Sequence, residues 1–190
     1  MTNAVLDAIA QRYSCRSYTD EPVAKADLDA LALAAVQAPS ANGAAPWYLA
    51  IITNHDLIQE INAAALQGLK KRDAAAHERA LARGGDLFYN GRALIVVAIK
   101  QAEGSIPKAL DAGILVQNVT LAAHSLGLGT LINGLSAMAF SSEYFPEADR
   151  LVNAVAIPEG YAMSIAIVVG HPDKTRAPHT PDLTPVHFFA

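Results

Sequence analysis

The sequence predicts a protein built around one β-sheet that is covered by helices. Two apolar runs, at residues 94–99 and 163–169, have the length of strands and are rich in β-branched side chains. Such runs are typical of strands buried on both faces. Between them, residues 109–126 are apolar almost all round, which is typical of a helix in a core or a subunit interface. Helical and strand patterns alternate loosely along the chain, and one helix-covered sheet accounts for them.

The N-terminal forty residues predict two helices. Apolar side chains recur at helical spacing in residues 3–13, after a cap at Thr2 or Asn3. A second helical period begins at Leu28. This helix is expected to end before Pro39, because the residue that precedes a proline avoids helical geometry.

The middle of the chain predicts a strand and a long helical stretch. Residues 48–53 form a short apolar strand, and Asn54 is placed to cap the helix that follows. Residues 55–83 are alanine-rich and highly charged, so we expect a partly exposed helix that ends at two glycines. Residues 55–90 together are interpreted as a mobile lid.

The C-terminal tail, residues 172–190, contains four prolines. We expect it to run extended across the surface or over a partner chain, because proline disfavours the interiors of helices and sheets. No internal repeat or linker divides the sequence. A single domain over residues 1–190 is therefore expected, large enough to bury about seventy per cent of its unfolded surface.

The composition argues against several functional classes. The net charge of −4, without a basic run, argues against a nucleic-acid binder. Cys15 is the only cysteine and the six histidines are dispersed, so neither an intrachain disulfide nor a metal site is expected.

Apolar residues make up 52% of the chain, which favours burial of some of them between chains. Asp7 interrupts the N-terminal apolar residues, so we expect no signal peptide, no membrane span and a cytoplasmic location.

The glycine motif at residues 127–130 does not predict a nucleotide site. It reads Gly-Leu-Gly-Thr and has Ile132 where a dinucleotide fingerprint needs its third glycine. The pattern before it predicts a helix, whereas the fingerprint follows a strand. No Walker-type motif occurs. Any chemistry is therefore expected to come from a bound cofactor.

Arg12, Ser14 and Arg16 stand at alternate positions at the end of the first predicted helix. Two guanidinium groups and a hydroxyl suit a phosphate monoester and the hydroxyls of a ribityl chain. This RxSxR spacing resembles the signature that opens nitroreductase-family proteins. Taken alone, these residue types at a helix end are more often a solvated surface.

Further segments resemble the same family in the same order, and the likeness covers nearly the whole chain. The family's Pro-Ser and Pro-Trp loop matches residues 38–40 and 46–47, and its core helix with the glycines that follow matches residues 121–129. The flanks of its final strand match residues 157–161 and 170–172. Its further phosphate-binding cations match Lys174 and Arg176.

The resemblance implies an α+β fold with a three-layer arrangement, a central mainly antiparallel sheet covered by helices, and an interlocked homodimer. FMN is expected at the dimer interface with contacts from both chains. By position, the resemblance assigns binding of the phosphate and ribityl chain to Arg12, Ser14, Arg16, Lys174 and Arg176. It assigns contacts from the other protomer to Pro39, Ser40 and Asn42. It also implies that a backbone N–H at Asn133-Gly134 lies against flavin N5.

The implied function is an FMN-dependent oxidoreductase. It transfers hydride from NADH or NADPH to a small acceptor, such as a nitroaromatic or a quinone, by a ping-pong mechanism. The flavin carries the chemistry, so no side chain is expected to be catalytic. Two alternatives stay open: oxygen-dependent chemistry or dehalogenation on the same fold, and a non-catalytic flavin-binding protein. Gly43 and Ala45, where the family has Asn and Gln, favour the last alternative, and Asn42 lies one position early.

Several side chains near these motifs have two interpretations. Cys15 is either a thiol activated by its arginine neighbours or, as we favour, a small buried apolar residue. Phe88 and Tyr89 either line an acceptor pocket or pack against the sheet. Arg92 either points to the site or, as we favour, faces solvent. Residues 70–72 either bind the 2′-phosphate of NADPH or, as we favour, form a solvated helix face.

Overall fold

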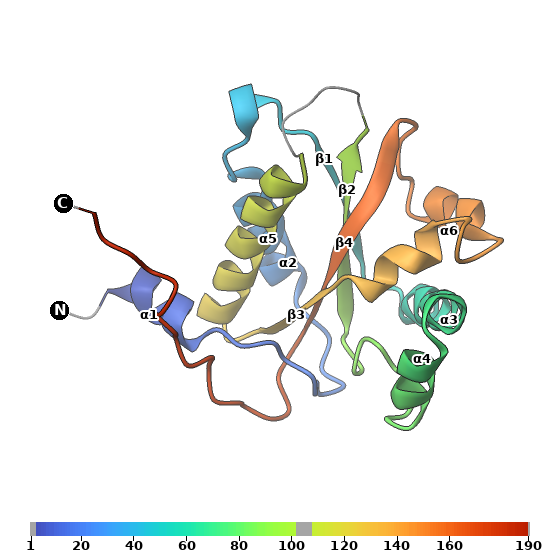
Figure 1. Cartoon of the computed structure of the whole chain (residues 1–190), viewed down its shortest axis with the longest axis horizontal. Helices are drawn as coiled ribbons and strands as arrows, with labels where there is room; N and C mark the ends of the chain where they lie inside the picture. Colours follow the sequence, from blue (N-terminus) through green and yellow to red (C-terminus); the bar gives the residue numbers. More distant parts are fainter. Residues whose placement is uncertain (1–2, 102–107, 190) are drawn as a thin grey trace.

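The chain forms a four-stranded sheet with helices on both faces (Figure 1). A computed structural model describes residues 3–101 and 108–189. The strand order is β1 (Trp47–Ile52), β2 (Ala93–Lys100), β4 (Tyr161–Gly170) and β3 (Gly129–Asn133), and every neighbouring pair is antiparallel. The α+β class and the antiparallel sheet expected from the sequence are confirmed.

Strand β2 lies at the centre because both of its faces are apolar. Alternate side chains of a strand point to opposite faces of the sheet. Leu94 and Val96 therefore enter one hydrophobic core, and Ile95 and Val97 enter another. All four side chains are at most 1% exposed. The sheet thus separates two cores, and each core takes its own set of helices.

The first core lies under α2 (Lys25–Val36) and α5 (Lys108–Ser125). The side chain of Asn118 on α5 donates a hydrogen bond to the carbonyl of Ala34 on α2, at 3.1 Å. Helix α1 (Ala4–Gln11) contacts α5 beyond them. It is capped by Asn3, whose side chain accepts from two backbone N–H groups, and none of its residues is buried. Thr2, the other expected cap, lies outside the described residues.

The second core lies under α3 (His55–Arg72), α4 (Ala74–Leu81), α6 (Ala148–Ala154) and the 3-10 helix η2 (Leu135–Phe140). Asp73 ends α3 and caps α4 with its carboxylate. A Cβ on Gly68 of α3 would lie 2.7 Å from the Cβ of Met138, so α3 packs closely on η2. The structure therefore places α3 in the core, while the mobility of residues 55–90 stays a prediction.

Four elements were not expected from the sequence: the 3-10 helix η1 (Ala41–Gly43), β3, η2 and α6. Each is short, and β3 directly follows the glycine turn that ends α5. The tail from residue 174 onward forms neither helix nor strand and is exposed as far as residue 189. No helix among the described residues is long and apolar enough to span a bilayer.

Candidate functional site

The segment that holds Arg12, Ser14 and Arg16 lies along strand β3. Ser14 forms an isolated parallel bridge with Thr130, and the Cys15 N–H donates to the Thr130 carbonyl at 2.8 Å. Cys15 is fully buried, as favoured from the sequence. Because side chains alternate along an extended segment, Ser14 and Arg16 point away from the core that Cys15 enters.

Two glycines let this segment approach the sheet. A Cβ on Gly129 would lie 2.8 Å from the Cys15 sulfur, and one on Gly170 would lie 2.8 Å from the Tyr18 ring. The Tyr18 hydroxyl donates toward the carbonyls of Cys15 and Val168, at 3.3 and 3.5 Å. Burial, together with the nearby Cys15 thiol, raises the pKa of the Tyr18 phenol far above its usual value. The phenol therefore stays protonated and keeps the segment in place.

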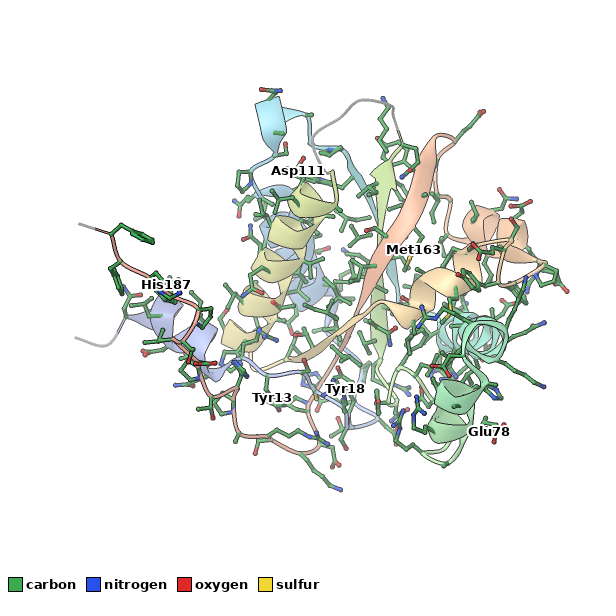
Figure 2. The ribbon with its side chains drawn as sticks, in the orientation of Figure 1. Tyr13, Tyr18, Glu78, Asp111, Met163 and His187 are labelled. Carbon is green, nitrogen blue, oxygen red and sulfur yellow. The ribbon has the colours of Figure 1, made fainter. Side chains whose placement is uncertain are left out.

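The start of the C-terminal tail joins the same region. The Thr19 N–H donates to the His171 carbonyl at 2.9 Å, and the Ser17 hydroxyl donates to the Asp173 carboxylate at 2.9 Å. The Tyr13 hydroxyl donates to the carbonyl of Lys174 at 3.3 Å. Figure 2 shows Tyr13 close to the tail. Residues from the two ends of the chain thus meet, with Arg176 two positions beyond Lys174 in the exposed tail.

A cavity of about 170 Å³ opens beside this segment. Arg16, Asn133 and Gly134 line it, so three residues expected at the flavin site border the same cavity. Arg83 and Tyr89 line it too, although sequence reasoning did not place Arg83 there. Arg83 follows α4 in an irregular loop, and only the glycines after it indicated a turn. Two guanidinium groups therefore border one cavity.

Two buried asparagines fix the loop on the far wall of this cavity. Asn62 of α3 accepts from the Leu87 N–H at 2.8 Å and donates to the Gly85 carbonyl at 3.1 Å. Asn133 donates to the Leu87 carbonyl at 2.8 Å and accepts from the Ser136 N–H at 3.0 Å. We call this arrangement the asparagine clamp. Both ends of the Asn133 side-chain amide are engaged in these hydrogen bonds. A ligand at this position would therefore contact the backbone at Asn133 and Gly134, and not the Asn133 side chain.

The clamp leads into a tight turn that separates two aromatic residues. The Asp86 carboxylate accepts from the N–H groups of Phe88 and Asn90, at 2.7 and 2.5 Å. Tyr89 has a φ of 55°, which costs a residue with a Cβ about 1–2 kcal/mol. Phe88 is 1% exposed and belongs to the core, whereas Tyr89 lines the cavity. Packing, one of the two roles considered from the sequence, is thus confirmed for Phe88, whereas Tyr89 packs partly against the core and also borders the cavity beside Arg16.

The cations of the site carry no neutralising partner within the described ranges. No ion pair is formed there by Arg12, Arg16, Arg83 or Lys174. Arg92 provides the contrast. It does not line the cavity, so the alternative that it points to the site is not supported, but it is only partly solvent-facing: its side chain is 24% exposed and lies 3.8 Å from Asp20. Of the unpaired cations, Arg16 and Arg83 line the cavity, while Arg12 and Lys174 lie on the segments beside it. Such cations suit an anionic ligand such as a phosphate monoester.

Pro39, Ser40 and Asn42 lie at the other end of α5. The Ala41 N–H donates to the carboxylate of Asp111, in the first turn of α5, at 3.2 Å. Figure 2 shows Asp111 and Tyr13 near opposite ends of that helix. An 18-residue helix is about 27 Å long, so one chain does not bring the two groups together.

Comparisons with known proteins match nearly the whole chain. A family model described as the nitroreductase family matches residues 9–171. A nitroreductase with bound FMN from Desulfitobacterium hafniense DCB-2 is 36% identical, with a TM-score of 0.92 and 100% of both chains covered. An NAD(P)H FMN reductase of Bacillus subtilis is 29% identical over 92% of this chain and 68% of its own. An FMN-dependent nitroreductase from Clostridium difficile R20291 is 23% identical and shares the fold, with a TM-score of 0.83 over 98% of this chain and 99% of that one.

Proposed function

The chain belongs to the nitroreductase family, and we propose that it passes hydride from NADH or NADPH, through bound FMN, to a small nitroaromatic or quinone acceptor. The observation that carries this proposal is the meeting of the two chain ends: Arg12 and Arg16 come from one end and Lys174 from the other. None of these cations is paired with a carboxylate in the described part of the chain.

The phosphate end of the site is formed by this meeting. Arg12, Arg16, Lys174 and Arg176 supply positive charge, and Ser14 supplies a hydroxyl for the phosphate or ribityl chain. The fit rests on donor chemistry, because guanidinium groups bind phosphate oxygens through paired, charge-assisted hydrogen bonds. The backbone pairing of Ser14 and Cys15 with Thr130 holds the segment of Arg12, Ser14 and Arg16 in place before a ligand arrives.

The ring end of the site is formed by the cavity beside the clamp. Gly134 lines it, and its N–H donates to no backbone acceptor among the described residues. We assign this N–H to flavin N5, with Arg83 and Tyr89 beside the ring. Bound FMN supplies hydride transfer, while the chain supplies binding and orientation.

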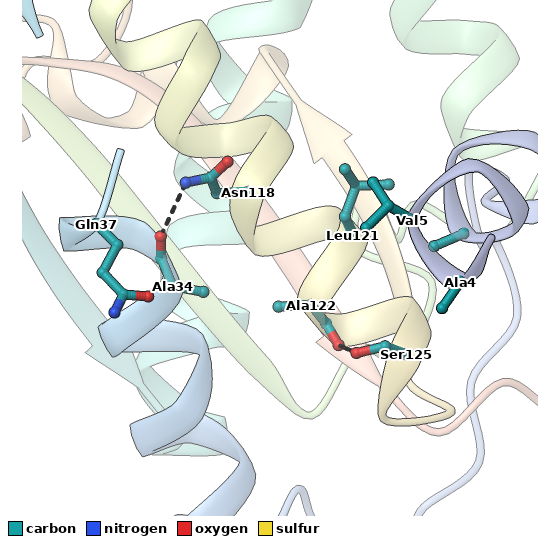
Figure 3. Close-up of a pocket in the computed structure, with 9 residues that line it drawn as sticks. Ala4, Val5, Ala34, Gln37, Asn118, Leu121, Ala122 and Ser125 are labelled. Carbon is teal, nitrogen blue, oxygen red and sulfur yellow. Dashed lines mark hydrogen bonds between the residues drawn. The ribbon is translucent and has the colours of Figure 1, made fainter. Parts of the chain in front are cut away.

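A second copy of the chain completes the site in this proposal. Pro39, Ser40 and Asn42 are too far from Arg12 in one protomer, so they come from the partner. Helix α1 supports such an interface, because Val5 is 62% exposed and faces a groove of about 400 Å³ between α1, α2 and α5 (Figure 3). Exposed apolar helix faces of this kind mark subunit interfaces.

The interface is tested by a charge in that groove. Val5→Glu is expected to give a monomer in analytical ultracentrifugation and to lose FMN, because the partner's loop is removed. Leu81→Glu is the matched control, since Leu81 is 47% exposed on α4, outside the groove. A wild-type monomer that binds FMN fully would reject the shared site.

The reaction is tested without oxygen. Addition of NADH or NADPH to FMN-loaded protein is expected to remove the visible absorbance, and a nitroaromatic or quinone to restore it. A ping-pong order predicts parallel lines in double-reciprocal rate plots. Absorbance that neither nucleotide changes would point to a non-catalytic flavin binder. A separate stopped-flow experiment mixes the reduced protein with oxygen or with a nitroaromatic, and preferential use of oxygen there would move the protein to oxygen-dependent chemistry.

A further inference from the structure

A second cavity, of about 500 Å³, adjoins the candidate flavin site. Gly134 lines both cavities, so they meet at the proposed backbone donor. The wall of the second cavity comes from the end of α3, from η2, from the loop before α6, and from α6 and β4. Its volume lies within the roughly 300–1,000 Å³ range of small-molecule sites. A molecule held there lies next to the reactive edge of the ring.

One side of this second cavity is apolar and firmly packed. Met138 is 3% exposed, and Phe140 and Met163 are half-buried. Figure 2 shows Met163 on β4, close to η2. Gly68 leaves no room for a Cβ between α3 and Met138, so the wall cannot shift far. Thioethers and an aromatic edge of this kind suit a flat aromatic ring.

The other side of the cavity carries one cation, Arg72, in the last turn of α3. Its neighbour Lys71 is already engaged, because it donates to the carbonyl of Glu143. Arg72 forms no ion pair with a carboxylate in the described ranges. A hydrogen bond with Glu143 raises the pKa of Tyr144, so this phenol stays protonated at neutral pH. The cavity thus offers a guanidinium and a neutral phenol.

Asp149 sets a limit on what binds here. Its carboxylate lines the same cavity and forms no ion pair within the described ranges. It repels an anion that approaches α6 and leaves the α3 side as the favourable position for a negative group. The hydroxyls of Ser141 and Ser142 complete the polar lining.

We propose that this second cavity binds the electron acceptor, and that Arg72 selects aromatic acceptors that carry a carboxylate. The proposal rests on the proposed function, because the acceptor is the molecule that the reduced cofactor serves. Arg72 is thereby a specificity-determining residue, separate from the cations that hold the FMN phosphate. Lys70, Lys71 and Arg72 are all exposed, as expected for the solvated helix face favoured from the sequence, and Arg72 lines the cavity as well.

The test compares 4-nitrobenzoate with its neutral analogue 4-nitrobenzamide in the FMN-loaded enzyme. Arg72→Gln is expected to raise KM for the carboxylate about three- to tenfold and to leave KM for the amide unchanged. Asp149→Asn is expected to act in the opposite direction and lower KM for the carboxylate. Lys70→Gln removes a charge from the same helix outside the cavity and serves as the matched control. Equal effects on both acceptors, or an effect on KM for NADPH alone, would overturn the proposal.

Binding of benzoate, measured by calorimetry on the FMN-loaded protein, separates this proposal from the reaction itself. Benzoate is redox-inert, so its affinity does not depend on turnover. Weaker benzoate binding in Arg72→Gln supports the acceptor site even if NADH reduces no acceptor, in which case the proposed reaction alone fails. Unchanged benzoate affinity in Arg72→Gln overturns the acceptor site and leaves the flavin site standing.

Discussion

The two ends of the flavin site are built in different ways. At the phosphate end, exposed or half-buried cations project from a segment that backbone pairing holds against β3. At the ring end, buried amide side chains hold the wall itself, and Asn62 and Asn133 are only 7% and 6% exposed. The phosphate end is therefore expected to tolerate loss of its binding groups without unfolding. The ring end couples binding to stability.

The largest expected effect is on the asparagine clamp. Asn133→Ala leaves the Leu87 carbonyl and the Ser136 N–H without their partner, and each buried unsatisfied group costs about 1–3 kcal/mol. We expect the free energy of unfolding to fall by about 2–4 kcal/mol in urea titrations of the FMN-free protein.

Asn62→Ala separates the stability of the clamp from its effect on the ligand. Asn62 holds the same Leu87 loop, from the side of α3, and does not line the flavin cavity. A similar loss of stability is expected, with a smaller loss of FMN affinity than in Asn133→Ala. Equal losses of FMN affinity in both variants would contradict a specific role for the Asn133-Gly134 wall.

At the phosphate end, the effect is expected on binding and not on folding. Arg12→Ala and Arg176→Ala should each weaken FMN by about 1.5–3 kcal/mol, roughly ten- to a hundredfold, because a charge-assisted hydrogen bond is lost. Quenching of flavin fluorescence measures this. Arg79→Ala is the control, since Arg79 of α4 contacts the capping residue Asp73 and does not line the cavity. Unchanged FMN affinity in both site variants would refute the phosphate assignment.

A smaller effect on stability is expected at Tyr18, whose buried phenol donates hydrogen bonds to the carbonyls of Cys15 and Val168 and so holds the segment of the phosphate end. Its pKa is raised in the folded chain, so the neutral phenol contributes stability that is complete below pH 10 and declines as the pH rises further. The slope for one group is about 1.4 kcal/mol per pH unit. The difference in unfolding free energy between wild type and Tyr18→Phe should therefore shrink by about 1 kcal/mol between pH 10 and 11. A difference independent of pH would show that Tyr18 ionises normally in the folded protein.

Much of the fold could be predicted because its signals are local. The apolar runs of β2 and β4 and the all-round apolar helix α5 appeared near their observed bounds. Strand β3 was not predicted, because five residues after a glycine turn are too few to establish the two-residue period of a strand. Its pairing with β4 and with Ser14 comes from residues far away in the chain.

The candidate site divides in the same way. Arg12, Ser14 and Arg16 could be predicted as site residues, because their RxSxR spacing lies within one short segment. Arg83 carries no such spacing, and only the folded loop places it beside Arg16. The ion pair of Arg92 was missed for a related reason, since its partner Asp20 belongs to a distant segment. Contacts between distant segments decide these cases, and periodicity does not report them.

The central claim is that cations from both ends of the chain meet around one flavin phosphate. Riboflavin is FMN without that phosphate, so the most direct measurement compares the two affinities for the same wild-type protein. The account predicts that FMN binds at least about a hundredfold more tightly than riboflavin, because several charge-assisted hydrogen bonds depend on the phosphate. Equal affinities for FMN and riboflavin would contradict it.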